Sequence, residues 1–182
     1  MPQLSKKGTE LPTSPIRKLV QYSDQAKQRG IEVLHLNIGQ PDIAAPIEAI
    51  DAVKNSKLNL LPYGPSQGTL SYREKLVAYY HKHGISLSTE DIIVTTGASE
   101  ALNFALNVIC DAGDEIIIPE PFYANYNGFA SAASVRVVPV ISEFNSQFEL
   151  PSLENINKKI TPKTRAILLC NPSNPTGYVY NK

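Results

Sequence analysis

Short apolar runs alternate with stretches of helical periodicity along most of the chain. Apolar or β-branched runs predict strands at residues 31–38, 92–96, 115–118, 135–141 and 165–170. Apolar positions three and four residues apart predict helices over residues 14–30, 46–57, 70–83, 100–110, 122–133 and 151–160. From residue 91 onward, strand and helix alternate. This alternation predicts an α/β fold in which helices cover both faces of a mostly parallel sheet, a three-layer α/β/α arrangement.

Particular residues refine this outline. Residues 1–13 are polar and predict a loose arm, while Ser14-Pro15 is a typical helix start. Pro139 predicts an edge position or a strand end for its strand. In the helix over residues 70–83, Leu76, Val77 and Tyr80 are expected to face inward, and the charged stretch 73–75 outward. Leu153 and Ile156 are the expected inward positions of the helix over 151–160.

The helix that follows Ser99 is apolar on nearly all sides, which predicts burial on several faces or contact with another chain. Residues 58–68 hold two prolines, two glycines and Tyr63, and they predict an irregular surface or functional loop.

Composition narrows the possible functions. The chain has 182 residues, of which 42% are hydrophobic and 19% charged, so it can build a core. Its 17 basic and 17 acidic residues give no net charge, which argues against nucleic acid and anionic membranes as partners. No apolar run is long enough to span a membrane, and the first residues do not resemble a signal peptide. Cys110 and Cys170 are expected to be free thiols in the cytoplasm, and the three histidines predict no metal site.

Three unusual loops follow predicted strands. Gly97-Ala98-Ser99 turns a strand into a helix, and such a helix start binds anions. Tyr123 follows the second of these strands in a segment rich in proline and aromatics, and the sequence NPSNPTG at residues 171–177 follows the last. In a parallel sheet these loops share one edge, where ligands bind. Together they predict a planar, phosphorylated ligand, although each taken alone is also compatible with an ordinary turn or with core packing.

Five motifs resemble the class I/II, aspartate aminotransferase family of fold-type-I pyridoxal-phosphate enzymes. They occur in family order, over nearly the whole chain: NIGQPD (37–42), YGPSQGTLSYR (63–73), TTGASEAL (95–102), PEPFYANY (119–126) and NPSNPTG (171–177). The resemblance implies the pyridoxal-phosphate-dependent transferase fold. Residues 1–32 would form an arm and a helix of the small domain, and residues 33–182 an incomplete large domain that binds the cofactor.

The resemblance also implies roles for individual residues. Gly97, Ala98 and Ser99 would bind the phosphate of pyridoxal 5'-phosphate. Tyr123 would stack on its ring, and Asn174 would hydrogen-bond its O3′ oxygen. Two further residues extend this site: Tyr63 would reach the cofactor phosphate of a partner subunit in a homodimer, and Gly39 would lie near the substrate carboxylate.

The implied activity is amino-group transfer between an amino acid, aspartate or an aromatic one, and a 2-oxo acid. In the family, the lysine that forms the Schiff base, the acid at the pyridine nitrogen and the carboxylate-binding arginine follow the last motif. The Schiff-base lysine is therefore expected beyond residue 182, Lys182 is not a candidate, and the chain alone is expected to be inactive. The same motifs leave a pyridoxal-phosphate carbon–sulfur lyase, the effector domain of a transcription regulator, or a scaffold without cofactor as alternatives.

Overall fold

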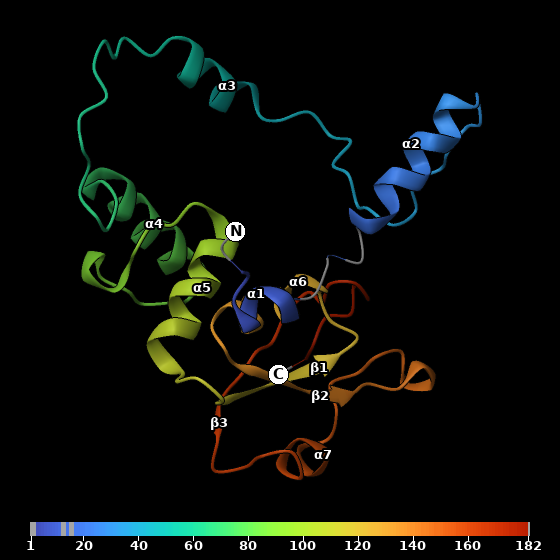
Figure 1. Cartoon of the computed structure of the whole chain (residues 1–182). Helices are drawn as coiled ribbons and strands as arrows, with labels where there is room; N and C mark the ends of the chain where they lie inside the picture. Colours follow the sequence, from blue (N-terminus) through green and yellow to red (C-terminus); the bar gives the residue numbers. More distant parts are fainter. Residues whose placement is uncertain (1–2, 12–13, 15–16, 182) are drawn as a thin grey trace. The chain divides into compact units, whose positions relative to one another are not determined.

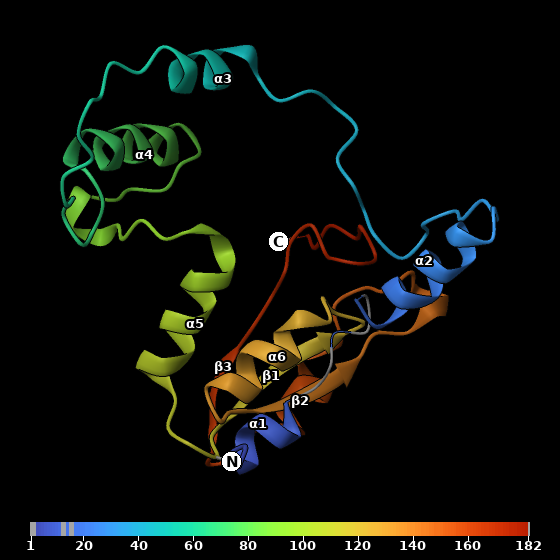
Figure 2. The ribbon, with the colours of Figure 1, turned by 45° about the horizontal axis from the view of Figure 1, so that its top comes forward.

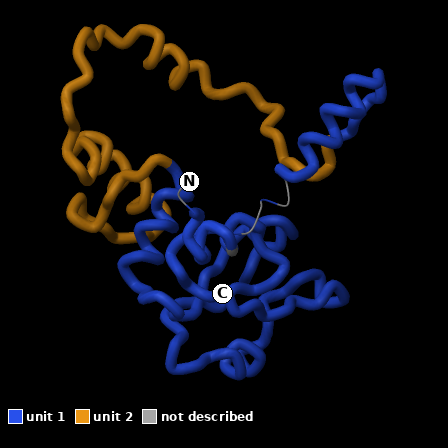
Figure 3. The backbone as a smooth tube through the Cα atoms, in the orientation of Figure 1, with its two compact units in different colours: residues 1–34, 97–182 blue, residues 35–96 orange. Residues whose placement is uncertain are grey.

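The chain folds into two compact units in the computed structural model, which describes residues 3–11, 14 and 17–181. Unit 1 comprises residues 1–34 and 97–182, and unit 2 comprises residues 35–96 (Figure 3). Unit 1 contains the sheet, whereas the regular elements of unit 2 are helical. The predicted division between residues 32 and 33 concerns the whole protein and stays a prediction.

The sheet of unit 1 has three parallel strands. They are β1 (Glu115–Glu120), β2 (Arg136–Ile141) and β3 (Thr164–Ile167), in the order β2-β1-β3. The predicted parallel α/β fold is therefore confirmed. β2 lies at an edge, as Pro139 predicts, because a proline cannot donate to a further ladder. β3 is shorter than the apolar run that predicted it.

Helices cover both faces of this sheet (Figures 1 and 2). Those of unit 1 are α1 (Lys6–Glu10), η1 (Arg17–Leu19), α2 (Val20–Gln28), α5 (Gly97–Ile109), α6 (Asn125–Ala132), η3 (Phe144–Ser146) and α7 (Leu153–Asn157). Alternate residues of β1 point to opposite faces. One face packs under α5 and α6 in a cluster of five buried residues: Leu106, Ile116, Ile118, Ala130 and Val135. The other packs against α7 in a second cluster: Ile117, Val138, Val140 and Ile156.

Unit 2 contains α3 (Ile47–Lys54), α4 (Leu70–Lys82) and η2 (Thr89–Asp91). The prediction that Arg73 faces outward is wrong, because this side chain is buried in α4. Its guanidinium donates to the carbonyls of Gly68, at 3.2 Å, and Thr89, at 2.5 Å. Helical periodicity assigns charged positions to the solvent face, but here two backbone carbonyls satisfy the buried charge.

Two predicted strands are absent from the described residues. Residues 31–38 form no ladder, and Leu34 and Leu36 are exposed there. Residues 92–95 run without regular structure, although Val94 donates its backbone N–H to the carbonyl of Gln67 at 3.0 Å. An apolar run becomes a strand only when a neighbouring segment supplies hydrogen-bond partners, which the sequence pattern does not encode.

Other local predictions also need correction. The arm contains α1, because the Ser5 hydroxyl caps it by accepting the Gly8 N–H at 3.0 Å. α5 buries only Leu106 within this chain, so the expected burial on several faces is wrong, and the alternative of contact with another chain stays a prediction. Leu153 is exposed, whereas Ile156 is buried as predicted. Of the predicted helix start, Pro15 and Ile16 lie outside the described residues, as does Lys182.

Candidate functional site

Gly97 sets the backbone of the predicted anion corner at the start of α5. Its φ is +79°, a left-handed conformation that glycine adopts without a steric penalty. Ala98 and Ser99 follow in the first turn and are exposed. First-turn N–H groups have no acceptor within their own helix, and they lie at the positive end of the helix dipole. The exposed first turn of this 13-residue helix can therefore take a phosphate without a lysine or arginine.

Tyr123 lies in the loop that leads from β1 into α6. Its ring is half-buried, and its hydroxyl accepts a hydrogen bond from the Asn125 side-chain amide at 2.6 Å. The ring of Tyr126 meets it edge-on, with centroids 5.4 Å apart and planes at 88°. These two contacts fix the orientation of the Tyr123 ring, so part of its surface is available to a flat ligand.

Tyr126 lies next to Tyr123, in the first turn of α6. Burial raises the pKa of its hydroxyl to about 12. In the loop after β3, the Cys170 thiol donates to the Pro172 carbonyl at 3.3 Å. Because β1 and β3 are parallel neighbours, the loop after β1 and the loop after β3 lie at the same carboxyl edge of the sheet.

Backbone hydrogen bonds hold the loop after β3 in shape. Asn171 binds the backbone of Tyr180 with its side chain, accepting at 3.0 Å and donating at 3.4 Å. Ser173 donates its N–H to the Tyr178 carbonyl, and its own carbonyl accepts from Gly177, both at 2.8 Å. The peptide bonds before Pro172 and Pro175 are cis. Asn174 is exposed within this ordered loop, so its amide is accessible to a ligand.

The predicted site residues lie in both units of the structure, and few contacts connect them. Among the described residues, Ser99, Tyr123 and Asn174 make no hydrogen bond or ring contact with one another. Packing relates two of them, because α5 contacts α6, which begins two residues after Tyr123. Gly39 and Tyr63 belong to unit 2 and are exposed. The roles of all these residues remain predictions.

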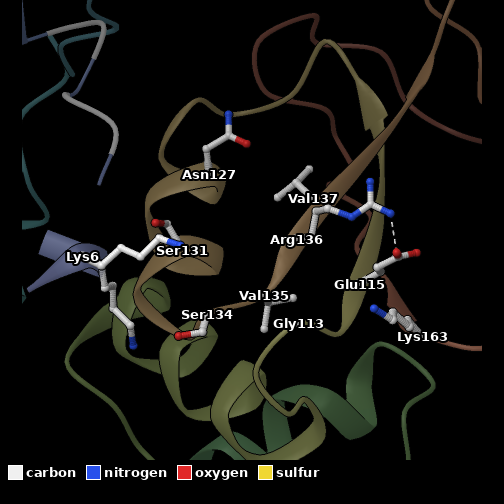
Figure 4. A pocket seen from close by; sticks show the side chains of 11 residues that line it. Lys6, Gly113, Glu115, Asn127, Ser131, Ser134, Val135, Arg136, Val137 and Lys163 are labelled. Carbon is white, nitrogen blue, oxygen red and sulfur yellow. Dashed lines mark hydrogen bonds and ion pairs between the residues drawn. The ribbon is translucent and has the colours of Figure 1, made fainter. Parts of the chain in front are cut away.

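The opposite, amino edge of the sheet carries a cavity of about 880 Å³ (Figure 4). Two of its cationic side chains have protein partners: Arg136 pairs with Glu115, and the Lys7 ammonium donates to the Ala132 carbonyl at 2.9 Å. Glu115 also accepts from the Thr161 hydroxyl at 2.8 Å, and the Arg136 and Thr161 hydrogen bonds lower its pKa. None of the predicted ligand-binding residues lines this cavity.

The residues at the carboxyl edge match the groups of pyridoxal phosphate. The α5 start suits a phosphate, the Tyr123 ring suits a planar heterocycle, and the exposed Asn174 amide can donate to a phenolic oxygen. Sequence reasoning missed Tyr126, whose ring contacts Tyr123. The signal that could have found it is its spacing from Tyr123, which places the two aromatic rings about one helical turn apart.

A parallel sheet covered by helices, with Tyr123 and Asn174 beyond the ends of β1 and β3, fits the class of pyridoxal-phosphate-dependent transferases. Comparison with known proteins gives the family. Residues 31–182 match the family model "Aminotransferase class I and II", so the chain belongs to that family. Members of this family use pyridoxal phosphate.

Individual relatives agree with the family match. Glutamate-pyruvate aminotransferase AlaA of Escherichia coli K12 is 33% identical over 168 residues, which are 90% of this chain and 41% of that protein. Aspartate aminotransferase of Geobacillus stearothermophilus is 30% identical over 98% of this chain and 46% of its own length. The solved alanine aminotransferase from Pyrococcus furiosus superimposes with a TM-score of 0.88 at 32% identity, covering 99% of this chain and 47% of that one. The chain thus spans less than half the length of these relatives.

Proposed function

We propose that the protein containing this chain is a pyridoxal-phosphate-dependent aminotransferase that moves an amino group between an amino acid and a 2-oxo acid. The supporting observation is the chemistry of the α5 start, the Tyr123 ring and the exposed Asn174 amide, which match the three groups of the cofactor. The names of the matched relatives, aminotransferases for glutamate-pyruvate and for aspartate, favour amino transfer over carbon–sulfur bond cleavage. Aspartate or an aromatic amino acid is the proposed donor.

Each proposed role follows from the chemistry of its side chain. The first-turn N–H groups and the Ser99 hydroxyl would hold the phosphate, and the Tyr123 face would fix the plane of the ring. Asn174 would donate to O3′ and so favour its anionic form. When bound, the cofactor supplies an electron sink for bond breaking at the substrate α-carbon. Gly39, which has no side chain, would leave room for the substrate carboxylate.

A homodimer is part of this proposal, with Tyr63 reaching the cofactor phosphate of the partner subunit. The ring of Tyr63 is fully exposed, which leaves it available for such a contact. We also propose a cytoplasmic location and a role in amino-acid biosynthesis. Among the described residues, no helix is long and apolar enough to cross a membrane.

The test is binding of pyridoxamine 5'-phosphate to this chain, followed by the ligand's fluorescence. Pyridoxamine phosphate carries the phosphate, ring and O3′ groups but has no aldehyde, so it cannot react with surface lysines. Ser99→Ala and Asn174→Ala should each weaken binding by about 10-fold or more, since hydrogen bonds to charged groups contribute about 1.5–3 kcal/mol.

The matched controls are Ser86→Ala and Asn157→Ala, which change exposed residues of the same types outside the proposed site. Both should bind the ligand as the unchanged chain does. Equal affinity for all five proteins, or binding that inorganic phosphate does not compete away, would contradict the proposed site.

A further inference from the structure

Positive charge is concentrated around the cavity at the amino edge of the sheet. Four cationic side chains line it, Lys6, Lys7, Arg136 and Lys163, and among the described residues that line it Glu115 is the one acidic residue. The whole chain, by contrast, has equal numbers of basic and acidic residues. The lining of this cavity therefore carries an excess of positive charge that the overall composition does not account for.

These cations come from segments that are far apart in the sequence. Lys6 and Lys7 belong to α1, Arg136 is the first residue of β2, and Lys163 directly precedes β3. Figure 4 shows Lys6 on one side of the cavity, and Arg136 with Lys163 on the other. Cations brought together by the fold repel one another, and an anion between them removes that repulsion.

The cationic side chains keep hydrogen-bond donors for a ligand. The Lys7 ammonium donates to the Ala132 carbonyl at 2.9 Å, and this neutral acceptor uses one of its three N–H donors. Arg136 pairs with Glu115, but its side chain is 64% exposed, so part of the guanidinium fork remains accessible. Lys163 is exposed, and its carbonyl accepts the Glu115 N–H at 2.9 Å, which fixes its backbone beside the cavity.

Neutral donors complete the lining, namely the Asn127 amide and the Ser131 and Ser134 hydroxyls. Guanidinium, ammonium and hydroxyl groups together are the donors that phosphate oxygens accept from. Lys7 also has a structural role, because the Ala132 carbonyl belongs to the last turn of α6. Lys163 lies in the turn before β3, where it caps no helix, so it is the residue that tests a ligand site.

We propose that this cavity binds a multiply charged phosphate anion, which bridges the α1 lysines to Arg136 and Lys163 at the strand starts. Its volume of about 880 Å³ is that of a small-molecule site. None of the residues of the proposed cofactor site lines it, so the two sites can be tested separately. Because the anion would contact α1, its binding would also stabilise that helix.

The experiment is a calorimetric titration of the chain with pyrophosphate at low salt. The variants are Lys163→Gln, Lys7→Gln and the two combined. Lys159→Gln and Lys54→Gln are the matched controls, since both lysines are exposed and neither lines the cavity. Urea unfolding of each variant shows whether the fold is retained, and the exposed Lys163 keeps the test decisive if Lys7→Gln loosens the arm.

Two further measurements make the assignment specific. Citrate, a polycarboxylate, and adenosine diphosphate, an organic phosphate, are titrated beside pyrophosphate. Amide hydrogen exchange of Thr9 reports on α1, because the Thr9 N–H donates to the Ser5 carbonyl at 3.0 Å. Ser99→Ala is titrated with pyrophosphate as well, to separate this cavity from the proposed cofactor site.

Lys163→Gln and Lys7→Gln should each weaken pyrophosphate binding by about 3- to 10-fold, and the double variant by about the product of the two losses. The controls and Ser99→Ala should retain the affinity of the unchanged chain for this cavity. Citrate should bind more weakly than pyrophosphate. Tighter binding of adenosine diphosphate would assign an organic phosphate, and equal binding the phosphate groups alone. Saturating pyrophosphate should slow Thr9 exchange by at least the factor that Lys7→Gln loses, because coupling between sites is reciprocal.

Several results would overturn this site. The same affinity in Lys163→Gln as in the unchanged chain removes it, and an equal loss in Lys159→Gln shows only a general effect of charge. Citrate binding as tight as that of pyrophosphate refutes the assignment to phosphate. Unchanged Thr9 exchange at saturation refutes the bridge to α1. If Ser99→Ala weakens pyrophosphate binding and Lys163→Gln does not, the anion binds at the cofactor site, and the cavity proposal alone is wrong.

Discussion

Replacing Gly97 with alanine tests whether the α5 start depends on its left-handed backbone. A Cβ added at Gly97 meets no atom within 4 Å, so the substitution causes no clash. The substitution destabilises the folded state only through the backbone angle φ, which is +79°. A non-glycine residue with a left-handed backbone destabilises the folded state by roughly 1–2 kcal/mol. Alanine also lowers the conformational entropy of the unfolded chain, which offsets about 0.4–1 kcal/mol of this loss. Gly97→Ala should therefore lower the free energy of unfolding by about 1 kcal/mol, equivalent to about a 5-fold change in the folding equilibrium.

Gly128 provides the matched control. It lies within α6, has no positive φ, and a Cβ there also meets no atom within 4 Å. Because glycine weakens a helix interior, Gly128→Ala should raise the free energy of unfolding by roughly 0.5–1 kcal/mol. Gly97→Asn should recover part of the loss, since asparagine tolerates the left-handed region better than alanine does.

The assay is urea unfolding followed by circular dichroism, combined with titration of pyridoxamine 5'-phosphate. Gly97→Ala should lose both stability and affinity, because strain in the first turn of α5 displaces the N–H groups that would hold the phosphate. A Gly97→Ala chain as stable as the unchanged one, with the same dissociation constant, would refute the reasoning that this corner requires glycine.

Three further changes probe the framework around the site. Ile117→Ala should cost about 2–5 kcal/mol in urea unfolding and Ile117→Val about 0.5–1.5 kcal/mol, since this side chain is fully buried; equal stabilities would contradict its place in the core. Arg73→Met should cost about 1.5–3 kcal/mol and accelerate amide exchange around Gly68 and Thr89, whose carbonyls lose a charged donor; unchanged exchange would show that water replaces the guanidinium. The pKa of Glu115 is lowered by its hydrogen bonds to Arg136 and Thr161, so the stability it contributes is present above its ordinary pKa and lost as the pH falls. The melting temperature should drop between about pH 6 and pH 3, less steeply in Glu115→Gln, and identical slopes would exclude this carboxylate as a cause.

The sheet could be predicted because its signals are local. β1 is a run of three isoleucines, and Pro139 assigns β2 to an edge before any partner is known. The parallel order then follows from helices that intervene between consecutive strands. Because parallel strands have their carboxyl ends at the same edge, the sequence also predicted that the loops after β1 and β3 share that edge. The parallel pairing of β1 with β3 confirms this prediction.

The wrong predictions concern residues whose structure depends on partners far away in the sequence. Residues 31–38 have the apolar character of a strand but no pairing segment within the described chain. Arg73 is buried because two carbonyls outside its own helical turn accept its guanidinium. Sequence patterns report the environment of a segment, whereas these contacts depend on which segments meet.

The two edges of the sheet differ in electrostatics, and this difference bears on where a phosphate binds. At the amino edge, Asp114 pairs with Arg165 at 2.8 Å and Glu115 with Arg136, and in both carboxyls these partners help to lower the pKa. These ion pairs connect neighbouring segments of the sheet and stabilise the strand starts. Of the proposed cofactor-binding residues, Ser99, Tyr123 and Asn174 carry no formal charge, and the first turn of α5 adds the acidic Glu100. An anion held there would gain from aligned N–H groups rather than from lysine or arginine, so its affinity depends on the shape of the backbone. For that reason, glycine is expected to matter more at this site than any single charged side chain.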